Sequence, residues 1–334
     1  MIEVNHLVKR YGNTLAVDDL SFTVEEGQIY GFLGPNGAGK STTMNIMTGY
    51  IAPTSGEVSI DGHNILEEPE EARKCIGYLP EIPPLYTDMT VEEYLAFAAE
   101  LKKIPKGKIR VMMDEIMNIT GLLEMRSRLI RNLSKGYRQR TGLAQAILGY
   151  PKIIILDEPM VGLDPKQIIE IRDLIRELGK NHTVILSSHI LSEVSAVCDQ
   201  IMIISHGKLA ANDTPENLEK LMEGSNTLNL TVKGDALSLQ RILKQTEGIL
   251  SCSVTSSEEK EALDVVIKAE TGLDLRERLF YLLADLKMPI LSLQQSRVSL
   301  ETVFLELTGE EPSESPEKPA AEPASDSDER SEDQ

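Results

Sequence analysis

Short apolar runs alternate with helical patterns over roughly the first two thirds of the chain. The runs Ile153–Leu156 and Val184–Leu186 are continuously apolar, which is typical of strands that are buried on both faces of a sheet. Strands that alternate with helices usually form a parallel sheet with crossover helices. We therefore expect strands at Gln28–Leu33, Lys152–Asp157, Thr183–Ser187 and Gln200–Ser205, and helices at Lys40–Thr48 and Gln167–Leu178.

A helical insertion and a second kind of domain follow from the rest of the pattern. Between Val91 and Leu148 the pattern is mainly helical, and we expect this first domain to cover residues 1–224. Residues 225–308 show the order strand, helix, strand, strand, helix, strand, which is the order of a ferredoxin-like α+β domain. The expected elements are Leu228–Val232, Leu237–Lys244, Ile249–Val254, Leu263–Lys268, Leu273–Leu286 and Ile290–Gln294, with a further helix at Leu300–Leu307.

Residues 309–334 differ from both domains in composition. They contain ten acidic and two basic residues among many Pro, Ser and Ala, and no large apolar side chain. Such a segment cannot recover the entropy of ordering by burial, so we expect a disordered acidic tail. The 225–308 region shows no candidate chemistry, and we expect an accessory or regulatory domain there.

Charge and apolar content limit the partners. The formal net charge is -19, which argues against general binding to nucleic acid. No apolar run approaches the ~18 residues that a membrane helix needs, and Met1–His6 does not resemble a signal peptide. The three cysteines, Cys75, Cys198 and Cys252, form no CxxC pair, so we expect reduced thiols.

A glycine-rich segment carries the strongest chemical signal. Gly34-Pro35-Asn36-Gly37-Ala38-Gly39-Lys40-Ser41-Thr42 fits the pattern GxxxxGK[ST] and stands between an expected strand and an expected helix. Glycines let backbone N–H groups approach a triphosphate, and the helix N-terminus adds positive potential. Lys40 is expected to reach the β- and γ-phosphates, and Ser41 to offer its hydroxyl to Mg²⁺. The sequence therefore predicts an α/β fold of the P-loop NTPase class that binds ATP.

Two acids follow the apolar strand Ile153–Leu156. Ligands of doubly wound sheets bind at the carboxyl ends of the strands, so Asp157 is expected to reach Mg²⁺, directly or through water. Glu158 is expected to polarise the attacking water as a general base. His189 ends the next expected strand and could contact the γ-phosphate, although a histidine at a strand end is often structural.

Together these segments resemble the ATPase domain of ABC transporters over about Met1–Gly224. The distinguishing element is Leu133-Ser134-Lys135-Gly136-Tyr137-Arg138-Gln139-Arg140, which resembles the family signature LSGGQxQR. The resemblance implies a mostly parallel sheet with a small antiparallel β part and a helical subdomain. It also implies that Ser134 and Gly136 contact the γ-phosphate bound by an opposing subunit, and the physics agrees, because Ser134 is a good helix N-cap.

The resemblance assigns roles to three further residues. Tyr11 matches the aromatic that stacks on adenine, and Asp164 matches the loop that crosses the dimer interface. His189 matches the switch histidine. The segments Tyr78-Leu79-Pro80-Glu81 and Leu133–Arg140 also resemble those of a narrower group, the single-domain ATPases of bacterial and archaeal exporters.

Two departures from the family pattern affect the site. The signature has Lys135 and Tyr137 where the commonest form has Gly and Gln. Glu81, in Gly77-Tyr78-Leu79-Pro80-Glu81, stands where the family usually carries Gln. Glu81 remains an oxygen ligand for a hard cation and adds a negative charge near the phosphates. The alternative is a solvated loop acid with no role in the site.

The resemblance implies a divided site and a set of partners. ATP with Mg²⁺ would join two subunits head to tail, either two copies of this chain or this chain and a paralogous ATPase. A separate transmembrane permease would use the resulting motion for transport, most simply export, with the chain cytoplasmic and peripheral on the inner face of the membrane. The competing functions are a soluble ABC ATPase acting on ribosomes or DNA, and a P-loop kinase of a small metabolite.

Overall fold

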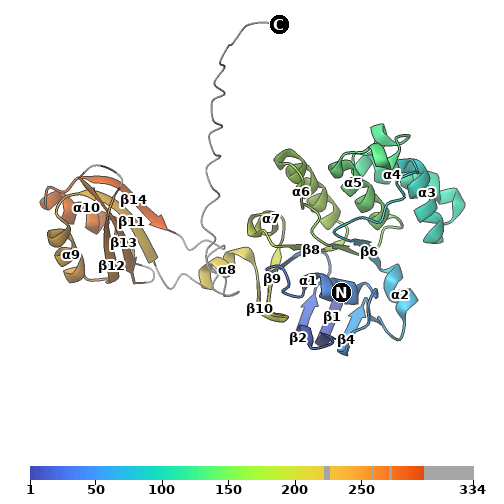
Figure 1. Cartoon of the computed structure of the whole chain (residues 1–334), viewed down its shortest axis with the longest axis horizontal. Helices are drawn as coiled ribbons and strands as arrows, with labels where there is room; N and C mark the ends of the chain where they lie inside the picture. The colour runs from blue at the N-terminus through green and yellow to red at the C-terminus, as the bar shows by residue number, and fades with distance from the viewer. Residues whose placement is uncertain (222–225, 258, 260, 271–272, 297–334) are drawn as a thin grey trace, which may run out of the picture.

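The computed structural model describes residues 1–221, 226–257, 259, 261–270 and 273–296. Its central feature is a six-stranded sheet in the order β10-β9-β3-β8-β7-β6 (Figure 1). The strands are β3 (Ile29–Leu33), β6 (Ile76–Leu79), β7 (Ile153–Leu156), β8 (Thr183–Ser188), β9 (Gln200–Ser205) and β10 (Lys208–Asp213). All pairs are parallel except β9 with β10. The mostly parallel sheet predicted from the apolar runs is therefore confirmed.

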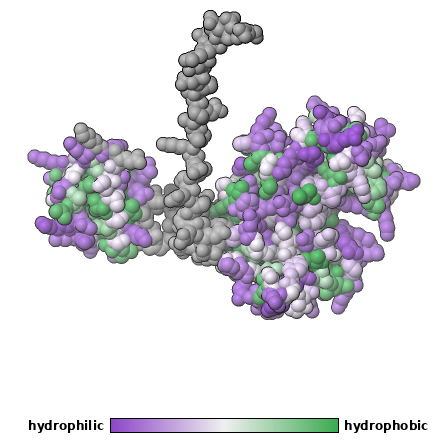
Figure 2. Space-filling view, viewed as in Figure 1, coloured by the Kyte–Doolittle hydropathy of each residue, from purple (hydrophilic) through white to green (hydrophobic). Residues whose placement is uncertain are grey.

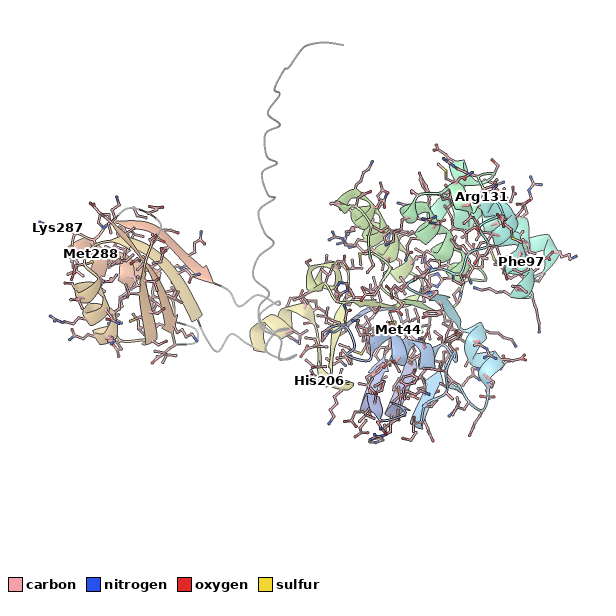
Figure 3. The ribbon with its side chains drawn as sticks, in the orientation of Figure 1. Met44, Phe97, Arg131, His206, Lys287 and Met288 are labelled. Carbon is pink, nitrogen blue, oxygen red and sulfur yellow. The ribbon has the colours of Figure 1, made fainter. Side chains whose placement is uncertain are left out.

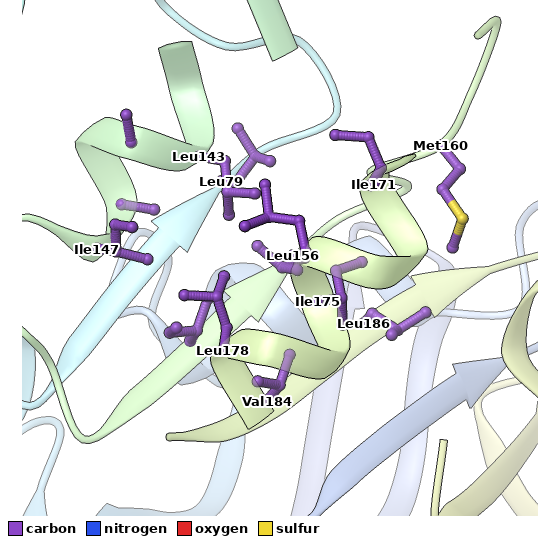
Figure 4. Close-up of a cluster of buried hydrophobic side chains, with 14 of the residues drawn as sticks. Leu79, Leu143, Ile147, Leu156, Met160, Ile171, Ile175, Leu178, Val184 and Leu186 are labelled. Atoms are coloured by element: carbon purple, nitrogen blue, oxygen red, sulfur yellow. The ribbon is translucent and has the colours of Figure 1, made fainter. Parts of the chain in front are cut away.

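Alternate residues of the central strands enter two hydrophobic clusters. Ile154 and Leu156 of β7 belong to one cluster, whereas Ile153 and Ile155 belong to the other. This division follows from the period of two in a strand, and it explains why the whole run is apolar. In the first cluster, side chains of β6, β7 and β8 pack against α6 (Pro165–Gly179) and α5 (Lys135–Ile147) (Figure 4).

A small antiparallel sheet shares the second cluster. Its order is β2-β1-β4-β5, formed by β1 (Ile2–Tyr11), β2 (Thr14–Val24), β4 (Ser55–Ile60) and β5 (His63–Asn64). Ile2 and Val4 of β1 lie in the same cluster as Phe32 of β3 and Met44 of α1 (Lys40–Met47; Figure 3 labels Met44). This shared core fixes α1, and with it the glycine-rich segment, against both sheets.

The insertion between β6 and β7 is helical, as predicted. It contains α3 (Val91–Leu101), α4 (Lys106–Ile119) and α5, with short 3-10 turns at Leu123–Met125 and Ile130–Asn132. Three shorter helices lie elsewhere: α2 (Pro69–Lys74), α7 (Leu191–Ser195) and α8 (Pro215–Leu221). α3 begins with a capping box in which Thr90 and Glu93 satisfy each other's backbone N–H groups.

The side chain of Lys102 closes the end of α5. The ammonium of Lys102 donates to the carbonyls of Gln145, Ala146 and Leu148 at 3.1, 3.0 and 2.8 Å. These are carbonyls that a helix end leaves without an intrahelical partner. Burial lowers the pKa of Lys102 to about 8. Lys102 therefore ties the end of α3 to the end of α5.

The later part of the chain forms a separate four-stranded antiparallel sheet in the order β12-β13-β11-β14. Its elements are β11 (Asn226–Lys233), α9 (Ala236–Gln245), β12 (Ile249–Ser256), β13 (Ala262–Ala269), α10 (Arg276–Asp285) and β14 (Ile290–Ser296). They enclose a cluster of their own. The predicted element order is present, and the ferredoxin-like assignment rests on this order alone.

One predicted boundary in this part is wrong. The helix expected at Leu273–Leu286 begins at Arg276 instead, because the side chain of Asp274 accepts the backbone N–H of Arg276 at 3.0 Å and so forms a turn before it. The helix expected at Leu300–Leu307 and the tail 309–334 lie outside the described residues. The domain limits 1–224, 225–308 and 309–334 therefore stay a prediction.

Among the described residues, no helix combines the length and the apolar character needed to cross a bilayer. On the visible face, hydrophilic and hydrophobic residues are interspersed rather than gathered into one apolar belt (Figure 2).

Candidate ATP-binding site

The glycine-rich segment forms the connection from β3 to α1. Gly39 is the N-cap of α1 with φ of 106°, a left-handed conformation that favours glycine, and a Cβ there would lie 2.5 Å from the carbonyl oxygen of Ala16. Lys40, the first residue of α1, is 6% exposed. Its ammonium donates to the carbonyls of Gly34 and Pro35 at 2.6 and 3.2 Å. The segment therefore wraps around the lysine as the motif predicts.

The carboxyl end of β7 brings two acids to this loop. Asp157 is 4% exposed, and its Oδ1 accepts the hydroxyl of Ser41 at 3.3 Å. Glu158 is 8% exposed, and its Oε1 lies 3.7 Å from the ammonium of Lys40. The Nδ1 of His189, from the end of β8, lies 3.0 Å from Oε2 of Glu158. Residues distant in sequence thus form one compact polar cluster.

Ser187 organises this cluster and was missed by the sequence reasoning. Its hydroxyl donates to Oδ1 of Asp157 at 2.6 Å and accepts the backbone N–H of Glu158 at 2.8 Å. One buried side chain on β8 therefore fixes both acids that follow β7. The available signal was a serine directly after three apolar strand residues, where burial would require hydrogen-bond partners.

The backbone of Glu158 adopts an uncommon conformation. Its φ is 47°, in the left-handed region that non-glycine residues rarely occupy. Such a conformation costs about 1–2 kcal/mol and persists only where the surroundings impose it. The hydrogen bond from Glu158 N to Ser187 contributes to holding it, and the result turns the carboxylate toward Lys40 and His189.

A cavity of about 270 Å³ lies at this cluster. Its lining residues are Ala16, Asn36, Gly37, Gly39, Lys40, Ser41, Thr42, Glu81, Glu158, Val161 and His189. The structure therefore brings Glu81, which is exposed just after β6, to the same cavity as the phosphate-binding segment. Ala16 and Val161 were not predicted, since nothing in their side chains indicates a role.

Ser134, Gly136 and Asp164 lie elsewhere. They line a different cavity of about 740 Å³, which begins at the N-termini of α5 and α6 and extends along α6 to Glu177. Ser134 is the N-cap of α5, and Asp164 is the N-cap of α6, accepting the N–H of Gln167 at 2.9 Å. A Cβ at Gly136 would lie 2.6 Å from Oε1 of Gln167, so glycine permits this close approach of the two helices.

Tyr11 does not belong to either cavity lining. It is the last residue of β1 and is 49% exposed, with the ammonium of Lys9 5.1 Å from its ring centroid. The next strand, β2, contributes Ala16 to the lining of the smaller cavity. Tyr11 is thus connected to the site through the hairpin, and stacking on adenine stays a prediction.

The donor set fits a hard divalent cation. The hydroxyl of Ser41 and the carboxylate of Asp157 are adjacent oxygen ligands, with Glu81 on the same cavity. No group of three His, Cys, Asp or Glu side chains within the described residues could hold a metal alone. The protein therefore offers a partial ligand set of the kind that phosphate oxygens and waters complete.

A buried lysine inside a glycine-rich loop, facing a pair of acids at the end of a parallel strand, defines a P-loop ATPase. A family model described as ABC transporter matches residues 17–161. The bacitracin transport ATP-binding protein BcrA of Bacillus licheniformis is 36% identical over 311 residues, which cover 92% of this chain and 97% of the relative. The chain belongs to the ABC transporter family and is similar throughout to its ATP-binding, ATP-hydrolysing subunits.

Two further comparisons agree with this membership. The daunorubicin/doxorubicin resistance ATP-binding protein DrrA of Streptomyces peucetius is 32% identical over 311 residues, covering 92% of each chain. The solved structure of MJ0796, a bacterial ABC transporter cassette described as dimeric, is 25% identical with a TM-score of 0.59, covering 64% of this chain and 98% of that one.

Proposed function

We propose that this chain is the motor of an export system, acting with a separate transmembrane permease at the cytoplasmic face of the membrane. The observation that carries the proposal is the cluster of Lys40, Asp157, Glu158 and His189 at one cavity, which is equipped to bind and cleave a triphosphate. Export is supported by the similarity to subunits named for bacitracin transport and for daunorubicin and doxorubicin resistance.

Each side chain has a distinct role in this proposal. The N–H groups of residues 34–42 and the N-terminus of α1 bind the phosphates, and Lys40 neutralises their charge. Ser41 and Asp157 would hold Mg²⁺, with Glu81 beside it, and the bound cation would neutralise charge on the phosphates. Tyr11 supports the adenine.

Hydrolysis then depends on Glu158. Its carboxylate accepts a proton from the water whose oxygen attacks the γ-phosphorus, while the bond to the β-phosphate oxygen breaks and ADP departs. His189 lies within hydrogen-bond distance of that carboxylate and orients it. Ser187 positions Glu158 through its backbone N–H.

The separation of the two cavities supports a divided site. Ser134, Gly136 and Asp164 do not line the cavity that holds Lys40 and Glu158 within one chain. We propose that a second copy, or a paralogous ATPase, presents these residues to the γ-phosphate in a head-to-tail dimer. ATP then joins the subunits, and hydrolysis separates them.

An exposed apolar surface supports docking to the permease. Tyr50 and Ile82 are 79% and 82% exposed and line a mainly apolar cavity of about 680 Å³. Tyr50 lies shortly after α1, and Ile82 directly follows Glu81. A shift of α1 or of Glu81 on ATP binding would therefore displace residues of this surface. Large exposed apolar residues of this kind mark protein contacts. The part beyond residue 224 is proposed to be an accessory domain with an acidic tail.

Partner capture tests the proposal. A tagged Glu158→Gln chain is expressed in its native cells, membranes are solubilised gently with ATP and Mg²⁺, and the copurified proteins are identified. A polytopic membrane protein in stoichiometric amount is expected, and its recovery falls for the additional substitution Ile82→Asp. Ribosomal or DNA-repair proteins without a membrane protein would instead support a soluble ABC ATPase.

A further inference from the structure

Two of the residues that depart from the family pattern, Lys135 and Glu81, carry opposite charges. We propose that they form a pair between subunits: Lys135 of one copy is a positioning residue that faces Glu81 of the other at the γ-phosphate end of the ATP site. The inference rests on the proposed head-to-tail dimer. It adds a role for Lys135, which the phosphate-binding function of its neighbours does not require.

The cavity that Glu81 lines has an excess of negative charge. Among its lining residues in the described part of the chain, Lys40 is the one side chain with a permanent positive charge, and Glu81 and Glu158 are both acidic. Asp157 adds a further acid next to this cavity, because its carboxylate accepts a hydrogen bond from the lining residue Ser41. A bound triphosphate adds further negative charge. Lys40 and the Mg²⁺ of the proposed function offset part of this charge, but an acid at position 81 adds to the negative excess and so favours one further cation from outside the chain.

Lys135 is a cation without an acidic partner among the residues that the structure describes. Within the described residues its ammonium forms no hydrogen bond or ion pair, whereas Arg140 on the same helix pairs with Glu170. Lys135 is also the first residue of α5, where the helix dipole already supplies positive potential and no acid stands in the first turn. A lysine there is unfavourable for the isolated subunit, so its charge is available to an anion on a partner.

The position of the Lys135 ammonium is consistent with a contact to an anion on a partner subunit. A Cβ at Gly162, in the loop between Glu158 and α6, would clash with this ammonium, so the Lys135 side chain reaches the loop that carries Asp164 two residues later. Lys135 stands between Ser134 and Gly136 in sequence. When these two residues approach the γ-phosphate of the opposing subunit, Lys135 is carried with them to the cavity that Glu81 and His189 line.

A charge exchange tests the pair directly. Two chains are made in the Glu158→Gln background, one with Glu81→Lys and one with Lys135→Glu, and ATP-dependent dimerisation is measured by sedimentation. Each chain alone places like charges together at both sites, and we expect dimerisation at least about tenfold weaker than for the Glu158→Gln parent. In an equal mixture, the head-to-tail heterodimer pairs opposite charges at both sites, and affinity returns to within about threefold of the parent.

The matched control reverses a charge one turn further along α5. A single chain with both Glu81→Lys and Arg138→Glu still places two cations together at each site, so it is expected to dimerise no more tightly than the Glu81→Lys chain. Equal thermal unfolding midpoints for all chains exclude misfolding as the cause of weaker dimerisation. A mixture of the first two chains that dimerises no more tightly than either alone overturns the pair, as does unchanged dimerisation of the single variants. Failure of the parent itself to dimerise with ATP overturns the proposed head-to-tail site instead.

Discussion

Replacing Glu158 by Gln removes one negative charge from the candidate site while preserving the size of the side chain. Glu158 is 8% exposed, and its carboxylate lies 3.0 Å from Nδ1 of His189 and 3.7 Å from the ammonium of Lys40. A Gln amide can occupy the same volume and keep one oxygen toward each neighbour, but it cannot accept a proton from water. The substitution therefore separates proton acceptance from packing.

The expected loss follows from the role of a positioned base. General base catalysis contributes about 10²–10⁴ in rate, so hydrolysis is expected to slow by that factor, or about 2.7–5.4 kcal/mol in the barrier. Binding of ATP changes in the opposite direction. Without the carboxylate at 3.7 Å, the charge of Lys40 acts on the phosphates alone, so ATP affinity stays equal or rises.

Single-turnover hydrolysis and equilibrium ATP binding, measured on the same preparations, check both parts. Ser187→Ala is the matched comparison, because it removes the hydroxyl bonded to Glu158 N but leaves the carboxylate, and an intermediate rate is expected. Turnover of Glu158→Gln within about threefold of the parent chain would refute Glu158 as the base. A slow variant that also fails to bind ATP would show that Glu158 maintains the phosphate-binding segment Gly34–Thr42 rather than activating water.

Three other predictions concern stability and the second cavity. Lys102→Met leaves three helix-end carbonyls without their donor and is expected to lower the free energy of unfolding by about 1–3 kcal/mol, measured by denaturant titration. The hydrogen bond from Lys152 lowers the pKa of Asp61, so the pair stabilises the fold above the ordinary carboxyl pKa and this stability is lost as the pH falls through the lowered one. Asp61→Asn should therefore cost up to about 1 kcal/mol at pH 7 and progressively less toward pH 3 in the same titration. Gly136→Ala places a methyl group 2.6 Å from the flexible amide of Gln167, so the chain should fold while ATP-dependent dimerisation, followed by sedimentation, weakens.

The local parts of the site could be predicted from the sequence because their chemistry is encoded in adjacent residues. The segment Gly34–Thr42 needs glycines where the backbone turns and a lysine where the charge is, and both requirements are visible as spacing. The buried strand before Asp157 is visible as an uninterrupted apolar run. The fold class followed from the same patterns.

The parts that depend on contacts between distant segments could not be predicted. The role of Ser187 exists only because β8 lies beside β7 in register, and a serine in a strand gives no sign of its partner. Ala16 lines the cavity through the position of its backbone. α10 begins later than predicted because the side chain of Asp274 accepts the backbone N–H of Arg276. The hydrophobic period does not indicate whether such a side-chain bond replaces the first helical turn.

The left-handed backbone at Glu158 has a consequence for how this chain can be improved. Glycine would relieve the strain at that position, so a selection for heat resistance alone would favour a replacement that removes the base proposed for hydrolysis. On this proposal the most stable version of the protein and its working version are different sequences. Any stabilising library should keep residue 158 constant and seek its gains elsewhere.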